Sequence, residues 1–231
     1  RLICVCAWAC VCACVRLSDS TGKANEDCHG EGQGSCQEGQ AILLNGTSTS
    51  GKTTVATVLQ QKLKDPYLYV SLDQYRDSLP DKYRGLNSPP GTTGHDGLNV
   101  VPIDSRDGGK ISSIQFGYYG KKVLHGMRLS SAGLVRDGLN IIIDDILLEA
   151  SFLDDYLKAF RDLKLYLIGL FCPLETVEKR EASRIGRFPG TAQSQLEVCH
   201  AHEVYDLSLD TSILSPEDLS LIHISEPTRQ E

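Results

Sequence analysis

The 231-residue chain is 41% hydrophobic and 23% charged, an ordinary balance for a globular protein, and its length allows one substantial domain with tails. Its formal net charge of −7 argues against a general nucleic-acid binder, which needs a basic surface, so we expect no nucleic-acid partner. Small anionic ligands remain possible, because they need positive charge only locally.

The first 39 residues differ in composition from the rest of the chain. In "CVCAWACVCACV" (4–15), cysteine alternates with valine or alanine, which is open to three interpretations: a translated non-coding GT repeat, a secretory signal or membrane anchor, or a functional cysteine site. The apolar run is shorter than the roughly 20 residues of a membrane-spanning helix. Residues 19–40 are polar and glycine-rich. We therefore expect 1–39 to be a disordered or non-native segment, and no membrane contact for the body of the chain.

The cysteines are concentrated in that first segment. Of the nine in the chain, only Cys172 and Cys199 lie beyond residue 36. A disulfide framework would distribute its cysteines through the whole fold. The body is therefore predicted to be a reduced, cytoplasmic protein.

Short apolar runs alternate with helical patterns through the body, residues 40–218. The runs 41–45, 67–73, 140–145, 164–171 and 204–210 are predicted strands, and 52–63, 114–138, 151–163 and 173–187 are predicted helices. Continuous apolar strands separated by helices indicate a parallel five-stranded sheet covered on both faces, an α/β fold. Segment 76–113, rich in Gly, Pro, Asn and Asp, is predicted to be a long irregular insertion.

The far end of the chain has two interpretations. "LSLIHISEPTR" (219–229) resembles the translation of a sequencing-library adapter, so 219–231 is interpreted as an assembly scar; a natural strand and turn is the alternative. The motif "SPED" (215–218) has the serine and proline of a helix start. On this interpretation the domain at 40–218 lacks its final helix.

A phosphate-binding loop is predicted after the first strand. Gly46, Gly51, Lys52 and Thr53 fit the spacing G-x-x-x-x-G-K-[ST], between an apolar strand and an amphipathic helix as the motif requires. Backbone N–H groups and the helix N-terminus would surround phosphate, with Lys52 on the β and γ phosphates and Thr53 on Mg²⁺. A glycine-rich turn with a chance lysine is the alternative. The residues predicted to hold ATP here are Gly46, Thr47, Ser48, Thr49, Ser50, Gly51, Lys52, Thr53 and Thr54.

Three aspartates follow apolar strands and are candidates for chemistry. Asp73 would share the carboxyl edge of the sheet with the loop, where it could accept a proton from an attacking hydroxyl. A capping or turn aspartate is the alternative. Either Asp144 or Asp145 could contact the Mg²⁺ shell, or cap a helix or contact the acceptor; we take Asp144, with Thr53, as the metal candidate.

Three arginines are spaced to share one helix face. Arg180, Arg184 and Arg187 step by four and three residues, and their planar guanidinium groups match the charge that spreads during phosphoryl transfer. The following "GRFPG" (186–190) would end the helix and permit a mobile lid. A solvated basic face with Glu178 and Glu181 interleaved is the alternative.

Five segments in order resemble the chloramphenicol phosphotransferase-like family of small kinases. They are "ILLNGTSTSGKT", "DPYLYVSLDQYRDSLP", "IIIDD", "REASRIGR" and "HEVYDLSLDTS", and the resemblance runs from about 41 to about 218. It implies a P-loop kinase fold with a five-stranded parallel sheet and a small arginine-bearing lid, using ATP and Mg²⁺ to phosphorylate a hydroxyl. The founding acceptor is chloramphenicol, an antibiotic whose phosphorylation confers resistance.

The resemblance also assigns roles. It implies that Asp73 is the base and that Arg180, Arg184 and Arg187 lie in and beside the lid. We expect Lys52, Arg184 and Arg187 to act in catalysis with Asp73, and Arg180 to contact the nucleotide. Segment 76–113 matches poorly where the acceptor would be held, so the acceptor does not transfer with the fold. The predicted function is ATP-dependent phosphorylation of a small hydroxyl compound. The alternatives are another P-loop metabolite, nucleotide or sugar-nucleotide kinase, and a non-catalytic nucleotide-binding regulator.

Overall fold

The computed structural model describes residues 38–105, 108–184, 188–196 and 198–213. Its main sheet has five parallel strands in the order β2-β6-β1-β7-β8. The predicted five-stranded parallel sheet is therefore confirmed. The strands are β1 (Gln40–Asn45), β2 (Tyr67–Ser71), β6 (Asn140–Asp145), β7 (Lys164–Phe171) and β8 (Leu207–Asp210).

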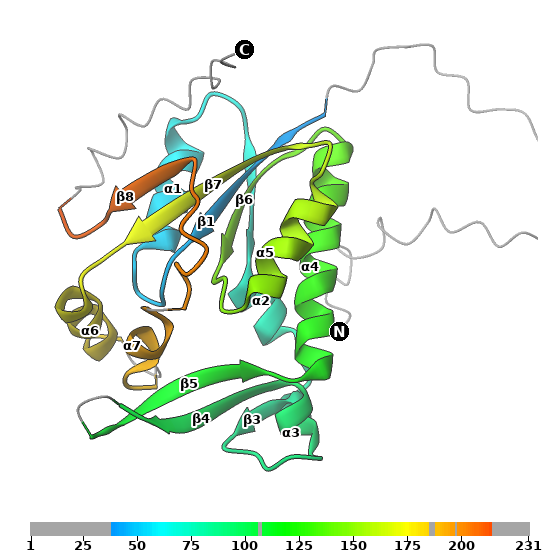
Figure 1. Cartoon of the computed structure of the whole chain (residues 1–231). Coiled ribbons are helices and arrows are strands. Elements are labelled where there is room, and N and C mark those ends of the chain that lie inside the picture. The colour runs from blue at the N-terminus through cyan, green and yellow to red at the C-terminus, as the bar shows by residue number, and fades with distance from the viewer. Residues whose placement is uncertain (1–37, 106–107, 185–187, 197, 214–231) are drawn as a thin grey trace, which may run out of the picture. The chain divides into compact units, whose positions relative to one another are not determined.

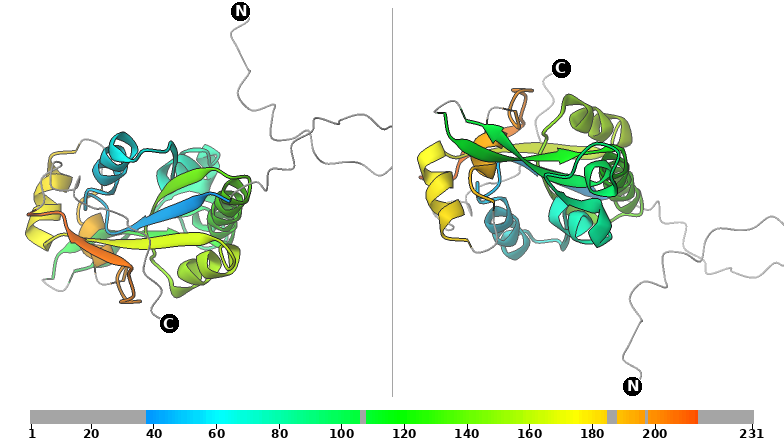
Figure 2. Two further views of the ribbon diagram at one scale, coloured as in Figure 1. Left: turned by 90° about the horizontal axis from the view of Figure 1, so that it is seen from above. Right: turned by 90° about the horizontal axis from the view of Figure 1, so that it is seen from below.

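Helices cover both faces of this sheet, as predicted (Figures 1 and 2). Helix α1 (Lys52–Lys62) packs on one face, where Ile42 and Leu44 of β1 contribute to the core. Helices α4 (Tyr118–Arg136) and α5 (Ala150–Ala159) pack on the other, against Leu43 and its neighbours. Successive β1 residues thus enter opposite cores, which explains the continuous apolar run 41–44 in this strand.

The prediction of an irregular insertion at 76–113 is wrong. This segment contributes the strands of a second sheet beyond the carboxyl ends of the main strands (Figure 1), in the order β3-β4-β5. Strands β4 and β5 pair antiparallel from Leu98 with Phe116 to Asp104 with Lys110. This pairing supplies backbone hydrogen bonds that outweigh the turn-forming residues of the segment. Its elements are η1 (Asp81–Tyr83), β3 (Arg84–Leu86), α3 (Thr93–Asp96), β4 (Leu98–Asp104) and β5 (Lys110–Phe116).

Two predicted elements change type within their length. The strand at 67–73 ends at Ser71, because Ser71 and Gln74 form a reciprocal capping box that starts α2 (Leu72–Asp77). The helix at 114–138 begins only at Tyr118, since residues before Gly117 belong to β5. In both places a strand leads into a helix with almost no connecting loop.

Two further helices differ from prediction in their bounds, and a third helix was not predicted. Helix α5 begins at Ala150, one residue before the predicted start, after an N-cap at Glu149, and it ends at Ala159 instead of 163. Helix α6 (Leu174–Ala182) is shorter than the predicted 173–187, and α7 (Thr191–Leu196) was not predicted. Buried Glu181 joins these two helices, because its carboxylate accepts hydrogen bonds from the backbone N–H groups of Gly190 and Ala192.

Several predictions concern residues outside the described part of the chain. These are the disordered or non-native segment 1–39, apart from its last two residues, the helix start at 215–218 and the scar at 219–231. Among the described residues, Cys172 and Cys199 are free thiols, and no helix combines the length and apolar character needed to cross a membrane.

An aromatic and polar cluster anchors the end of β1, directly before the phosphate loop. The Asn45 amide donates to the Tyr205 hydroxyl (2.7 Å) and to the Cys199 carbonyl (2.6 Å). The His200 Nδ1 lies 2.6 Å from the same hydroxyl, and its ring stacks on Phe171 with 4.1 Å between centroids. Burial lowers the pKa of His200 to about 4, so its ring is neutral near pH 7.

Lowering the pH from 7 to 4 should destabilise the protein through His200. Between the usual histidine pKa of 6.5 and the folded-state value of about 4, the unfolded chain binds the additional proton. The stabilising contribution of the neutral His200 ring should therefore be fully present above pH 6.5 and decrease as the pH falls towards 4. We expect a fall in melting temperature of a few degrees, measured by calorimetry, that is smaller in His200→Gln than in wild type. An equal fall in both proteins would contradict this account.

Candidate active site

The phosphate-binding loop has the geometry that its sequence predicts. It connects β1 to α1, and the N-cap of that helix, Gly51, has φ 98°, a left-handed conformation suited to glycine. A Cβ at Gly46 would lie 2.7 Å from the Leu170 carbonyl, so this position also requires glycine. The buried Lys52 ammonium donates to the carbonyls of Gly46 (2.9 Å) and Thr47 (2.8 Å), which curls the loop around it.

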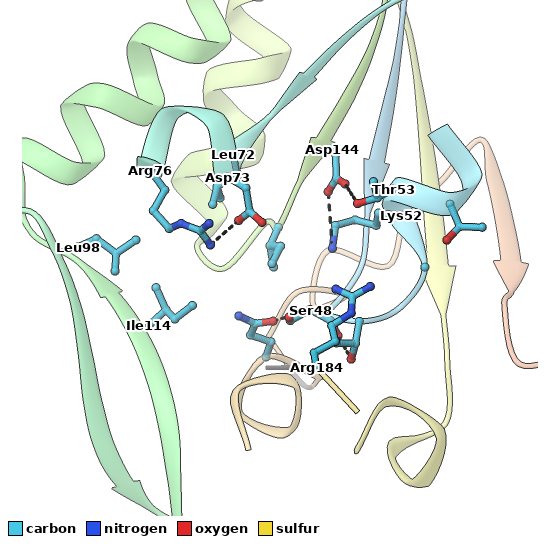
Figure 3. A pocket seen from close by; sticks show the side chains of 15 residues that line it. Ser48, Lys52, Thr53, Leu72, Asp73, Arg76, Leu98, Ile114, Asp144 and Arg184 are labelled. Atoms are coloured by element: carbon cyan, nitrogen blue, oxygen red, sulfur yellow. Dashed lines mark hydrogen bonds and ion pairs between the residues drawn. The ribbon is translucent and has the colours of Figure 1, made fainter. Parts of the chain in front are cut away.

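Asp144 faces this loop from the end of β6 (Figure 3). Its carboxylate lies 3.7 Å from the Lys52 ammonium and accepts a hydrogen bond of 3.0 Å from the Thr53 hydroxyl. The Tyr69 hydroxyl donates to the same carboxylate at 2.8 Å. Burial, and secondarily the charge of Asp144, raises the pKa of Tyr69 to about 12, so Tyr69 remains a donor.

Asp145 points away from the loop into the core behind β6. Its carboxylate pairs with the Arg128 guanidinium at 3.2 Å and accepts a 2.9 Å hydrogen bond from the Tyr156 hydroxyl. Arg128 also stacks over the Phe152 ring at 4.1 Å from the centroid. Burial first, then the charge of Asp145, raises the pKa of Tyr156 well above its usual value. The sequence did not decide between these two aspartates. In the structure Asp144 faces the phosphate-binding loop and Asp145 faces the core.

The predicted position of Asp73 needs a correction. It lies in the first turn of α2 and not at the end of a strand, because the capping box at Ser71 begins the helix earlier. Its carboxylate pairs with the Arg76 guanidinium at 2.7 Å. Asp73 nevertheless lines the same pocket as Lys52, Thr53 and Asp144 (Figure 3), as expected.

The three arginines have different positions. Arg184 lines the pocket that contains Lys52. Arg180 donates to the carbonyls of Thr49 (3.5 Å) and Thr211 (2.8 Å), which joins the loop to the end of β8. Arg187 lies outside the described residues.

The pocket also contains residues that sequence reasoning missed. The Gln195 side chain from α7 accepts a 2.7 Å hydrogen bond from the Ser48 backbone N–H. Arg76, Leu98 and Ile114 line the side opposite the loop. Arg76 could have been predicted from the sequence, because it follows the candidate Asp73 by three residues, a spacing that makes two residues neighbours on a helix. The others depend on long-range packing of the second sheet and α7.

A second pocket continues from the first over the second sheet. The two share Arg76, Leu98 and Ile114. The rest of its lining combines apolar and polar groups: Asp77, Arg84, Gly85, Leu86, Val100, Phe188 and Thr191. The Arg84 guanidinium donates to the Asp77 carbonyl, which ties β3 to the end of α2. Arg76, which pairs with Asp73, therefore borders both pockets together with the apolar side chains of Leu98 and Ile114.

The donor set around Asp144 fits a magnesium ion held with a nucleotide. Mg²⁺ usually binds proteins through one or two oxygen ligands and takes the rest from phosphate and water. The Asp144 carboxylate and the Thr53 hydroxyl provide two such oxygens beside Lys52. Among the described residues, no group of three or more His, Cys, Asp or Glu side chains could form another metal site. His200 and His202 therefore belong to no such group.

The fold and this loop define the chain as a P-loop phosphotransferase of the kinase type. The family model described as chloramphenicol phosphotransferase-like protein matches residues 39–226, and the chain belongs to that family. The resemblance stated from the sequence is thus confirmed. A Mycobacterium tuberculosis H37Rv protein provisionally named an O-phosphotransferase is 26% identical over 185 residues, 79% of this chain and 80% of that relative.

Solved kinase structures share the fold. The APS kinase of M. tuberculosis, in complex with AMPPNP and APS, has a TM-score of 0.53 at 19% identity, over 79% of this chain and 94% of that one. A sugar kinase from Janibacter sp. HTCC2649 has a TM-score of 0.52 at 20% identity, over 79% and 90%. These likenesses confirm the predicted P-loop kinase fold.

Removing Arg128 should strongly destabilise the fold, because Asp145 would remain buried without its ion-pair partner. We expect Arg128→Leu to lower the free energy of unfolding by about 3–5 kcal/mol in a urea titration. Arg136→Leu, on the same helix but exposed, should cost much less although it loses a hydrogen bond to the Ala159 carbonyl. Similar losses in the two variants would show that the buried pair contributes little.

Proposed function

We propose that this protein transfers the γ-phosphate of ATP to a hydroxyl group of a small molecule. The observation that carries the proposal is the pocket that unites Lys52, Thr53 and Asp144 with Asp73 across a single opening. One side offers positive charge and backbone N–H groups for phosphate. The other offers a carboxylate for the proton of an acceptor hydroxyl.

On the nucleotide side, the loop residues Gly46–Thr54 hold the phosphates of ATP. Their N–H groups and the α1 N-terminus bind phosphate oxygens, while Lys52 contacts the β and γ phosphates. Thr53 and Asp144 would hold Mg²⁺, which would neutralise phosphate charge when it is bound. Arg184 stabilises the charge that develops on the transferred group, and Arg180 supports the nucleotide near Thr211.

On the acceptor side, Asp73 takes the proton from the attacking hydroxyl. The hydroxyl oxygen then forms a bond to the γ phosphorus, and the bond from that phosphorus to the ADP oxygen breaks. Arg76 holds the Asp73 carboxylate through their 2.7 Å ion pair, so the base keeps a fixed orientation. The helical position of Asp73 in α2 supports this role better than a flexible loop would.

The second pocket supports an acceptor with both apolar and polar parts. Leu98, Val100 and Ile114 provide an apolar wall, and Arg84 provides hydrogen-bond donors at its edge. Chloramphenicol, the acceptor named in the family's description, has this character and is the first compound to test. Phosphorylation of such an antibiotic would confer resistance.

The full chain, ATP and Mg²⁺ should be incubated with a panel of hydroxyl compounds that includes chloramphenicol, sugars, nucleosides and shikimate. Mass spectrometry should detect an acceptor that has gained one phosphoryl group, together with an equal amount of ADP. A phosphorylated sugar or nucleoside would support another P-loop metabolite kinase. ATP binding without any product across the panel would favour the non-catalytic regulator.

Lys52→Ala should lower turnover at least about 100-fold and weaken ATP binding, because the point charge on the β and γ phosphates is lost. Both effects can be measured with the best acceptor and by calorimetric titration. Lys62→Ala, an exposed lysine at the end of the same helix, is the matched control and should behave as wild type. Unchanged ATP affinity in Lys52→Ala would show that the loop has another purpose.

Asp73→Asn should lower turnover by about 10²–10⁴-fold, the range that general-base assistance supplies. ATP affinity should stay within about threefold, since the proposed role includes no phosphate contact. Exposed Asp81→Asn serves as a control for the loss of one carboxylate nearby. Near-full turnover in Asp73→Asn would make Asp73 a structural partner of Arg76. A parallel loss of ATP affinity would place it on the metal–nucleotide complex.

A further inference from the structure

Helices α6 and α7 hold the outer part of the phosphate loop. The Thr49 hydroxyl lies 3.1 Å from the Val177 carbonyl of α6 and 2.6 Å from the Ser48 carbonyl, and it can donate to either. The Ser48 backbone N–H donates to Gln195 Oε1 of α7 at 2.7 Å. The loop is therefore fixed on its open side by residues distant in sequence, and Gln195 is the side chain that contacts a loop N–H group directly.

Gln195 carries a buried donor with no partner among the described residues. The residue is 2% exposed, and its Nε2 forms no hydrogen bond there, although Oε1 is bonded to Ser48. An unsatisfied buried donor is costly, and such groups in folded proteins usually await a ligand, ion or water. Because Gln195 also lines the pocket that contains Lys52 and Asp144, a ligand of that pocket is the acceptor that fits.

The chemistry of the surroundings identifies this ligand group. The neighbouring loop N–H groups, Lys52 and Arg184 are donors, so a group bound among them must have several acceptor oxygens. Thr47 Oγ1 and Ser50 Oγ of the same loop are likewise buried without partners among the described residues. A phosphoryl group, with three oxygens available to donors, meets this demand.

We propose that Gln195 Nε2 donates a hydrogen bond to an oxygen of the γ-phosphate, while Oε1 keeps the Ser48 N–H in place. This inference rests on ATP being the phosphoryl donor, as proposed above. Gln195 is then a catalytic residue that distinguishes ATP from ADP, because ADP has no group at this position. An uncharged donor suits the task, since it orients the phosphoryl group without adding an ion pair that transfer would have to break.

The second sheet fixes the position of Gln195. The Ser112 N–H of β5 donates to the Pro189 carbonyl just before α7 (3.1 Å), and Gln193 Nε2 of α7 donates to Ser105 Oγ (3.3 Å). Thr191 of the same helix lines the acceptor-side pocket. Helix α7 therefore carries both Gln195, on the side of the transferred phosphoryl group, and Thr191, on the side of the acceptor.

The test compares the affinities of the full-length protein for AMPPNP and ADP, each with Mg²⁺, by calorimetric titration. Gln195→Leu removes the donor and should weaken AMPPNP binding about 10- to 100-fold, the range for a hydrogen bond to a charged acceptor. ADP affinity should remain within about threefold. Gln61→Leu, at an exposed glutamine of α1, is the control for loss of one amide side chain and should leave the ratio of the two affinities unchanged.

A second variant separates the donor from the shape of the loop. Gln195→Glu keeps an oxygen for the Ser48 N–H but replaces Nε2 by another acceptor, so it should weaken AMPPNP binding at least as much relative to ADP. Equal losses for both nucleotides, or no loss for either, would overturn the inference and leave Gln195 as a support of the loop. A wild-type protein that binds neither nucleotide would instead overturn the proposed function.

Discussion

The buried Lys52 ammonium is the group around which the rest of the site is arranged. It is 8% exposed, and a charge so placed is costly unless polar groups surround it. The carbonyls of Gly46 and Thr47 and the Asp144 carboxylate supply that surrounding. Each depends on the fold: the loop can curl only with glycine at its two tight positions, and Asp144 is near only because β6 lies beside β1 in the parallel sheet.

The adjacent aspartates show how one strand serves the site and the core together. Successive residues of a strand face opposite sides of the sheet, so Asp144 meets Lys52 and Thr53 while Asp145 meets Arg128 and Tyr156. A buried ion pair gives little net stability compared with an apolar pair, but its hydrogen bonds have strict geometry. We infer that this pair fixes the end of β6 and thereby the orientation of Asp144.

The sequence allowed the main sheet and the nucleotide side of the site to be predicted, because both rest on local signals. The strands at 41–45 and 140–145 are continuous apolar runs, and Gly46–Thr53 is a contiguous motif in its expected context. The second sheet was missed since β4 and β5 stabilise each other across a turn, which turn-rich composition conceals. Gln195 was missed for a similar reason, because its contact with Ser48 spans 147 positions of the chain.

The acceptor and the nucleotide are proposed to bind to different parts of the fold. The groups proposed to act on ATP belong to the main sheet, its loop and helices α6 and α7, whereas the apolar wall proposed for the acceptor lies on the second sheet. Asp73 and Arg76 of α2 lie between these two groups of residues, and their ion pair fixes the Asp73 carboxylate. Changes at Val100 or Leu86 would therefore alter which compound fits without disturbing Lys52, Thr53 or Asp144. Specificity can then vary independently of the phosphoryl chemistry, which explains why the fold alone does not identify the acceptor.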